Sequence, residues 1–169
     1  ELPAVMLVEP SSDGERDDGG SNVPPLTQVF ALLRARHPDA RTVVVMPALD
    51  ESAASQRVAS GLARAAAAAS RKVTLLRAEG ATAVGTPAST EAEMRAAMAA
   101  ARGTDLVVAS RPSPRQQPLA MATGQTHPLV VLVGEAGRTR TADVREATRL
   151  MIGAGATTTV GVLTVPAWP

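Results

Sequence analysis

Short runs in which apolar residues occupy consecutive positions recur along the chain. Such runs are typical of strands covered on both faces, because a half-buried strand would alternate apolar and polar residues. They predict strands at residues 42–46, 72–78, 104–110, 127–136 and 158–165. The opening stretch "LPAVMLVEP", ended by Pro10, predicts one more short strand.

Helical patterns lie between these strands. The first, at residues 26–36, places Val29, Leu32 and Leu33 on one helical face, with Phe30 beside it. The pattern therefore predicts an amphipathic helix that packs on the sheet through these four side chains.

The second predicted helix covers residues 52–69, which are mostly alanine with some Arg and Gln. Asp50 and Ser52 are both candidates for its N-cap, because their side-chain oxygens can accept hydrogen bonds from the first-turn amides. Val58 and Leu62 are its larger candidates for core contacts.

Two more helices complete the pattern. Residues 90–102 open with Thr90 and Glu93 in capping-box spacing, and Gly103 follows as a helix stop. Residues 141–155 carry an apolar face made of Val144, Ala147, Leu150 and Met151.

Alternation of uniformly apolar strands with helices predicts an α/β fold: a parallel, mostly buried sheet with helices on both faces, in a three-layer Rossmann-like arrangement. We divide the chain into a leading strand at residues 1–10, a flexible linker at 11–25, rich in Ser, Asp and Gly, and an α/β domain at 26–169. In such sheets ligands bind beyond the carboxyl ends of the strands. Any site should therefore be built from the loops that follow Met46, Leu76, Ala109 and Val133.

Composition removes several classes of function. The absence of cysteine excludes disulfides, thiolate nucleophiles and cysteine metal sites. The net charge is +1, and Phe30 and Trp168 are the only aromatic residues, so neither a basic surface nor aromatic stacking indicates a nucleic acid partner. His37 and His127 each lie beside a proline and are too sparse to suggest a metal site.

The order of segments resembles the cytoplasmic domain of bacterial tyrosine kinases and their polysaccharide co-polymerase relatives, members of the deviant P-loop group that includes MinD and ParA. "TQVFALLRARHP" is similar to the family helix "EAFRALRTNL", "KVTLLRAEG" to "RVLLIDADLR", and "GTDLVVASRPSP" to "YDLVIIDTPP". The stretch around "AGRTR", followed by a helix and a "G-VL" strand, is the most specific part. The resemblance covers nearly the whole chain and implies a P-loop NTPase-like fold.

The nucleotide loop that this resemblance implies, residues 48–57, lacks the chemistry of a phosphate site. A phosphate loop needs glycines, whose backbone amides can converge on the anion, and a lysine for the terminal phosphates. The loop has neither: the lysine position falls on Ser55, or on Ala54 if one residue is inserted. Asp50 and Glu51 add negative charge where a triphosphate would lie, and Ser52 is explained as a cap.

The acidic positions of the family are also replaced. The first strand aspartate aligns with Arg77 and the second with Glu79, while the metal-linked aspartate aligns with Ser110, followed by Arg111. Magnesium held by phosphates still requires one or two carboxylates, and an arginine cannot supply them. We therefore expect no catalytic residues, no metal and no cofactor.

The resemblance then implies a non-catalytic, pseudokinase-like domain with a structural or regulatory role in a membrane-anchored machine for exopolysaccharide or capsule assembly. Its partners would be polysaccharide assembly proteins, at the cytoplasmic face of the bacterial inner membrane, and it would reach the membrane only through segments outside this chain. With no tyrosine in the sequence, autophosphorylation on tyrosine within the chain is impossible.

Two alternatives remain open. In the first, Arg57, Arg77 and Arg111 gather at the strand ends and bind an anion, which would make the chain an ATPase or tyrosine kinase that uses ATP and magnesium through an atypical loop. In the second, the domain is a homo-oligomerisation module without a ligand, in which Arg138 and Arg140 of "GRTR" either contact a neighbouring subunit or lie in a solvated loop.

Overall fold

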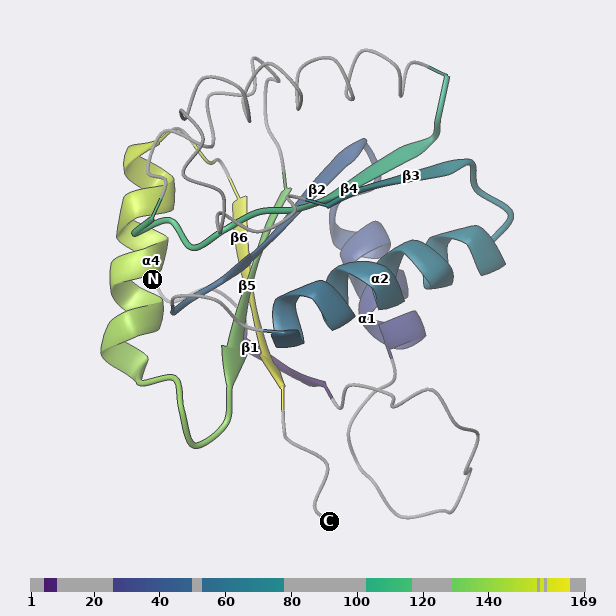
Figure 1. Cartoon of the computed structure of the whole chain (residues 1–169). Helices are drawn as coiled ribbons and strands as arrows, with labels where there is room; N and C mark the ends of the chain where they lie inside the picture. The colour runs from purple at the N-terminus through teal and green to yellow at the C-terminus, as the bar shows by residue number, and fades with distance from the viewer. Residues whose placement is uncertain are drawn as a thin grey trace, which may run out of the picture.

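A parallel β-sheet with helices on both faces forms the centre of the molecule in this computed structural model (Figure 1). The structure describes residues 5–8, 26–49, 53–77, 103–116, 129–154, 156 and 158–164. Within them the sheet has six strands in the order β1-β6-β5-β2-β4-β3, and every neighbouring pair is parallel. The strands are β1 (Val5–Val8), β2 (Thr42–Pro47), β3 (Val73–Arg77), β4 (Leu106–Ser110), β5 (Leu129–Glu135) and β6 (Thr158–Thr164).

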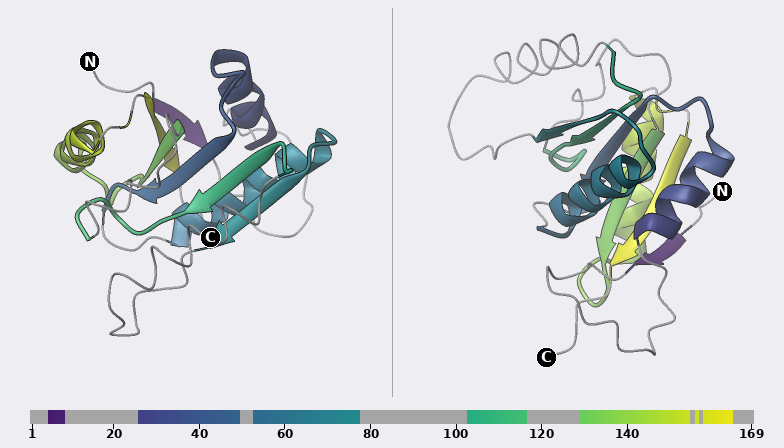
Figure 2. Two further views of the ribbon diagram at one scale, coloured as in Figure 1. Left: turned by 90° about the horizontal axis from the view of Figure 1, so that it is seen from above. Right: turned by 90° about the vertical axis from the view of Figure 1, so that its right-hand side faces the viewer.

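Helices cover the two faces of the sheet unequally. The helices α1 (Leu26–Arg36) and α2 (Ala53–Ala68) lie together on one face, and α4 (Thr141–Gly153) lies on the other (Figure 2). The predicted fold class is confirmed, and the predicted helix at 26–36 has the observed bounds. The predicted helix at 90–102 and the linker at 11–25 lie outside the described residues, although Gly103, the predicted helix stop, has a positive φ of 101°.

Consecutive residues of the central strands enter two different cores. Along β2, Val43 and Val45 belong to the core beneath α1 and α2, whereas Val44 and Met46 belong to the core beneath α4. The same alternation runs along β5, and all six residues of β2 are buried. This double burial explains why the strands read as uninterrupted apolar runs, since neither face is free for a polar side chain.

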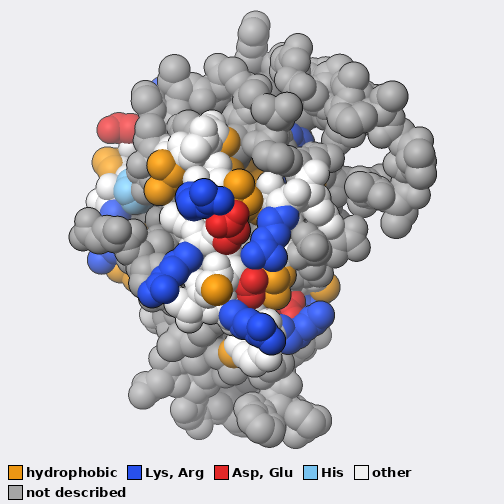
Figure 3. All heavy atoms as spheres, turned by 90° about the vertical axis from the view of Figure 1, so that its left-hand side faces the viewer, with side chains coloured by type: hydrophobic (Ala, Val, Ile, Leu, Met, Phe, Trp, Pro, Cys, Tyr) orange, Lys and Arg blue, Asp and Glu red, His pale blue; other side chains and the backbone are white. Residues whose placement is uncertain are grey.

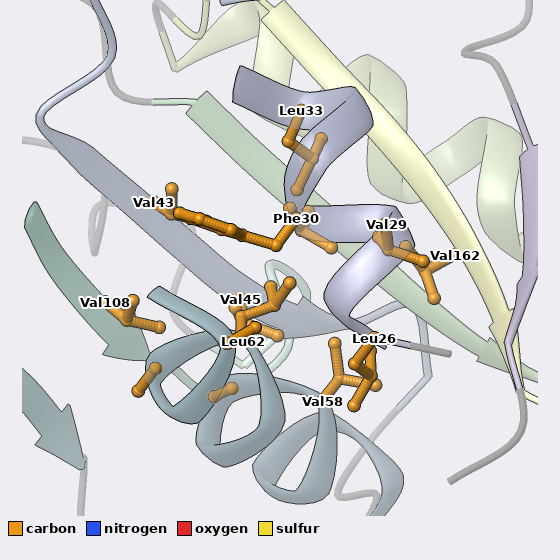
Figure 4. Close-up of a cluster of buried hydrophobic side chains, with 14 of the residues drawn as sticks. Leu26, Val29, Phe30, Leu33, Val43, Val45, Val58, Leu62, Val108 and Val162 are labelled. Carbon is orange, nitrogen blue, oxygen red and sulfur yellow. The ribbon is translucent and has the colours of Figure 1, made fainter. Parts of the chain in front are cut away.

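The core beneath α1 and α2 is built around Phe30, which packs among Leu33 of its own helix and valines of the sheet (Figure 4). Leu26 and Val29 also point inward from α1, whereas Leu32 does not: it is 46% exposed. The prediction for Leu32 was wrong. At 3.6 residues per turn it lies roughly 110° from the centre of the stripe formed by the four buried residues, so the helix turns it to solvent.

The apolar residues predicted for the other two helices are mostly confirmed. Val58 and Leu62 of α2 are fully buried, and Ala147 and Met151 of α4 are buried with Val144 packed against them. Leu150 is only partly buried. The polar residue Thr148 occupies a buried position instead, where its hydroxyl donates to the carbonyl of Val144 at 2.8 Å.

A glycine allows α1 and α2 to approach closely. A Cβ placed on Gly61 of α2 would lie 2.1 Å from Cδ1 and 3.3 Å from Cγ of Leu26 at the start of α1. Because Leu26 is itself buried, its side chain has little room to move away. The contact between the two helices therefore depends on the absence of a side chain at this position.

We predict that Gly61→Val destabilises the fold by about 1–3 kcal/mol, because the added methyl groups overpack the α1–α2 contact. The matched control is Ala67→Val on the exposed side of the same helix, which changes only helix propensity and should cost about 0.5 kcal/mol. Urea unfolding followed by circular dichroism measures both. Equal effects of the two substitutions would contradict a close approach at Gly61.

Candidate functional site

Three of the residues singled out in the sequence, Arg77, Ser110 and Arg111, lie at the carboxyl edge of the sheet. Ser110 ends β4, where it is in register with Val45 of β2 and with Arg77 of β3. The amide of Arg111 donates to the carbonyl of Val45 at 2.9 Å, so the chain leaves β4 directly beside the end of β2. The carboxyl edge of β2, β4 and β3 is thus the predicted location of the site.

The turn from β2 to α2 is the element that would hold phosphates. Beyond Pro47, which pairs with Val133 of β5, the amide of Ala48 still donates to the carbonyl of Val133 at 2.9 Å. Asp50, Glu51 and Ser52 lie outside the described residues, so their predicted charge and capping roles remain predictions.

Both positions predicted for the missing lysine are buried in the first turn of α2. Ala54 has no exposed surface and belongs to the apolar core shared with α1, and Ser55 is 3% exposed. A lysine at Ala54 would have to enter that packed interior, where an unpaired ammonium group is strongly disfavoured. The start of α2 therefore presents small side chains that pack inward at the two positions where the sequence resemblance places the lysine.

The three arginines proposed as anion contacts have different surroundings. Arg57 is exposed on α2, one turn after the helix begins. Arg111 is only 5% exposed, and its Nε and Nη1 atoms are buried. Arg77 shares the carboxyl edge with Arg111 through the register of β3 and β4, but its side chain, like the whole of Glu79, lies outside the described part.

A small group of buried polar residues surrounds the end of β4. Ser110 and Ser113 are buried on either side of Arg111 in the chain, and Ser113 has no exposed surface. A guanidinium does not lose its proton in proteins, so it can bind an anion but cannot act as a general base or as a metal ligand. No group of three or more His, Cys, Asp or Glu side chains that could hold a metal ion occurs within the described ranges.

The loop that follows β4 is fastened to α4. The Ser113 hydroxyl accepts a hydrogen bond from the amide of Arg115 at 3.2 Å, which folds the loop into a turn. Nη2 of Arg115 then reaches Oδ1 of Asp143, in the first turn of α4, at 3.1 Å. This ion pair joins the loop at the carboxyl edge of the sheet to α4, which lies on the sheet face away from α1 and α2.

The "GRTR" segment forms a compact turn between β5 and α4. The carbonyl of Glu135 accepts from the amide of Thr139 at 2.8 Å, and the Thr139 hydroxyl accepts from the amide of Glu135 at 2.8 Å. Gly137, with φ of 79°, supplies the left-handed residue that the turn requires. Arg138 extends outward, where its Nη1 pairs with Oε2 of Glu135 at 3.0 Å.

Sequence reasoning did not single out Thr139 or Asp143, although both fix the geometry of this segment. Oδ2 of Asp143 accepts from the amide of Arg140 at 3.0 Å, and thereby caps the start of α4. The available signal was an acidic residue in the first turn of a predicted helix, a position where acids stabilise free amides.

An apolar pocket lies away from these residues, at the amino ends of the strands. Its lining includes Val43, Leu106 and Leu129 near the starts of β2, β4 and β5, with Arg34 and His37 of the α1 region. Because ligands of parallel sheets bind beyond the carboxyl ends, this pocket is separate from the candidate site.

The sheet order and the helices on both faces define the class: a P-loop NTPase-like α/β fold. No protein-family model matches the chain, and no curated protein matches it in sequence. Solved structures do match in fold.

The kinase domain of the Escherichia coli tyrosine kinase ETK has a TM-score of 0.67 and 15% identity, with 100% of this chain and 92% of that chain covered. The BceF tyrosine kinase domain has a TM-score of 0.65 and 12% identity over 82% of this chain and 75% of that one. The chimerical protein CapA2B2 has a TM-score of 0.63 and 15% identity over 96% and 94%. The chain has the fold of bacterial tyrosine kinase domains, which confirms the resemblance at that level.

None of the helices in the described ranges has the length and apolar content needed to cross a membrane.

We predict that Asp143→Ala destabilises the protein by about 1 kcal/mol, because it removes the acceptor for the Arg140 amide at the start of α4. Asp143→Asn keeps a side-chain oxygen and loses mainly the ion pair with Arg115, so it should cost clearly less. Thermal unfolding of both variants measures the difference. If Asn is as damaging as Ala, the ion pair rather than the cap stabilises this helix start.

Proposed function

We propose that the chain is a non-catalytic, pseudokinase-like domain with a structural or regulatory role in exopolysaccharide or capsule assembly. By the sequence resemblance it works at the cytoplasmic face of the bacterial inner membrane, beside polysaccharide assembly proteins, and it self-associates. The observation that carries the proposal is the burial of Ala54 and Ser55 in the first turn of α2, where a kinase of this fold would present its phosphate-binding lysine.

Phosphoryl transfer requires positioned cations and metal-bound carboxylates more than any covalent chemistry by the protein. Removing one such contact typically costs on the order of 3 kcal/mol of transition-state stabilisation. In this chain the lysine positions hold buried small residues, and the end of β4 carries Ser110 and a buried Arg111 in place of a carboxylate. Among the described residues the ends of β2, β3 and β4 carry no carboxylate, and Glu135 at the end of β5 is already paired with Arg138, which supports a loss of catalysis.

The fold itself does not need the lost groups. The two cores beneath α1 with α2 and beneath α4 are built from apolar residues of the strands and the helices, and of the replaced positions whose side chains the structure describes only Ala54 belongs to them. A domain can therefore lose its phosphate site and keep its shape, which is what a structural role requires.

One observation favours a second candidate, in which the chain binds an anion or nucleotide through its arginines. Arg111 places a permanent positive charge within the buried end of β4, and a guanidinium in a low-dielectric site binds phosphate oxygens strongly. Under this candidate the anion would lie at the carboxyl edge near Arg111, with Arg57 and Arg77 as further contacts.

We expect isothermal titration with magnesium-ATP to give no binding in the micromolar range, and incubation with radiolabelled ATP to give no phosphate transfer to a tyrosine peptide. The ETK kinase domain, tested in parallel, serves as the positive control. Micromolar affinity would overturn the non-catalytic proposal. In that case Arg111→Lys should weaken binding if the arginine candidate is correct, whereas Arg36→Gln at the exposed end of α1 should not.

A further inference from the structure

The described residues carry an excess of positive charge that lies mostly away from α4. Of the 14 Lys and Arg residues in the described ranges, five belong to α4 and the loops beside it, which leaves nine, whereas only two of the five described acids lie away from α4. Around α4 each of the three acids is paired with an arginine, and blue and red side chains lie side by side on this face in Figure 3 (Figure 3). The other nine cations are therefore the larger unbalanced charge.

Five of these nine cations lie where the strands of the sheet begin. Each helix returns the chain to the start of the next parallel strand, so the ends of α1 and α2 meet the starts of β2, β3 and β4 at the amino edge of the sheet. In Figure 1 this is the right-hand side, on which α2 ends and β3 and β4 begin (Figure 1). We call the five cations there the basic edge: Arg34, Arg36, Arg41, Arg71 and Lys72.

Backbone hydrogen bonds hold the segments of the basic edge together. The carbonyl of Lys72 accepts from the amides of Asp105 and Leu106 at 2.8 and 3.2 Å, and the carbonyl of Arg41 accepts from the amide of Val107 at 2.8 Å. The starts of β2 and β3 therefore lie on either side of the start of β4, and their cations share one rim of the sheet.

One of the five side chains supports the fold, and the others do not. Arg34 donates from Nη1 to the carbonyl of Ala40 at 2.7 Å and from Nη2 to the carbonyl of Pro38, which closes the turn between α1 and β2. The other four are exposed, and within the described part of the chain their side chains form no hydrogen bond or ion pair: Arg36, Arg41, Arg71 and Lys72. Their charge is thus left for a partner.

Two acids lie at the basic edge without cancelling its charge. Oδ2 of Asp105 accepts from the backbone amide of Lys72 at 2.9 Å, and Asp39 is exposed in the turn between α1 and β2. Five cations and two acids leave a formal charge of +3. Arg57 and Arg64 continue the positive charge along the outer side of α2, a helix that contains no acid.

An apolar side chain lies beside these cations. Leu32 is 46% exposed and precedes Arg36 by one turn, so the two residues share a side of α1. Ala31 and Ala35, also exposed, lie next to them and add little relief to this side of the helix. The surface therefore presents one leucine among cations rather than a broad apolar patch.

We propose that the basic edge, together with Leu32, binds the surface of a membrane that contains anionic phospholipid. Guanidinium and ammonium groups bind phosphate oxygens, and clusters of about four to eight such residues are attracted to anionic bilayers. A leucine beside them can enter the boundary between head groups and acyl chains. This inference goes beyond the proposed function, in which the chain reaches the membrane only through segments outside it, because it adds a direct contact.

The side chains of this surface favour lipid over a protein or nucleic acid partner. The centre of a protein interface is rich in aromatic and other apolar side chains, whereas Leu32 is the one large apolar side chain exposed among the described residues outside α4. Single-stranded nucleic acids stack on aromatic rings, and Phe30, the one aromatic residue described, is buried. A lipid surface requires only positive charge and a shallow apolar anchor.

Co-sedimentation of the full chain with vesicles tests the proposal. The chain should bind vesicles of phosphatidylcholine with about 30% phosphatidylglycerol but not vesicles of phosphatidylcholine alone, and binding should fall as NaCl rises from about 0.05 M to about 0.5 M. Arg36→Gln with Arg71→Gln should weaken binding about 25-fold, because each cation near an anionic surface contributes about fivefold. Leu32→Ala should weaken it about fivefold at every salt concentration, because salt does not screen apolar burial.

The matched controls lie on the exposed side of α4. Arg145→Gln with Arg149→Gln makes the same change of charge, and Ile152→Ala shortens another exposed apolar side chain. Both should leave vesicle binding unchanged. A DNA duplex and polyglutamate, tested in parallel, should bind more weakly than the vesicles and should not respond to Leu32→Ala.

Absence of binding to the anionic vesicles, or equal binding to phosphatidylcholine alone, would contradict the proposal. Equal losses from the α4 controls would also sink it, since net charge rather than the basic edge would then account for the binding. Tight binding of DNA or polyglutamate with no effect of Leu32→Ala would assign the edge to a soluble polyanion instead. None of these results bears on the ATP titration, so the non-catalytic role stands or falls separately.

Discussion

The burial of both faces of the central strands is the constraint on which the rest of this structure depends. Because β2 and β5 contribute alternate residues to two cores, neither strand can shift register by one residue without exchanging its partners in both cores at once. The strands are therefore fixed relative to α1, α2 and α4. The positions of Ser110, Arg111 and the start of α2 follow from where the strands end, whatever side chains those positions carry.

Much of the architecture could be predicted because this burial leaves a clear trace in the sequence. The runs at β2, β4 and β5 are almost entirely apolar and only five to seven residues long, which is short for a buried helix and fits a strand covered on both faces. Leu32 shows a limit of such predictions, because an apolar side chain does not by itself reveal whether it lies within the narrow buried stripe of a helix or just outside it. Arg111 shows another: arginine is ordinarily exposed, and only the packing of the chain around the end of β4 reveals that this one is buried.

The sequence predicts at which edge of the sheet a site would lie, but not the hydrogen bonds around it, for a physical reason. Which strand ends meet follows from the parallel order, so Ser110 and Arg77 could be placed at one edge. Hydrogen bonds such as those of Thr139 and Asp143 depend instead on how a loop turns, which apolar periodicity does not record. The sequence shows directly that residues 48–57 contain no lysine, whereas the inward packing of Ala54 becomes visible only in the structure.

The two faces of the sheet differ in what their residues contribute to the protein. On the α1–α2 side, small and apolar residues such as Gly61 and Ala54 bring helices close to the sheet, so substitutions there act on folding. On the α4 side, the buried residues are few, and the outer surface is occupied by arginines supported from below by acids. Holding long charged side chains in place costs conformational entropy and returns little stability at a surface. Substitutions on the outer surface of α4 should therefore change stability less than substitutions at Gly61 or Ala54, where packing fixes the helices against the sheet.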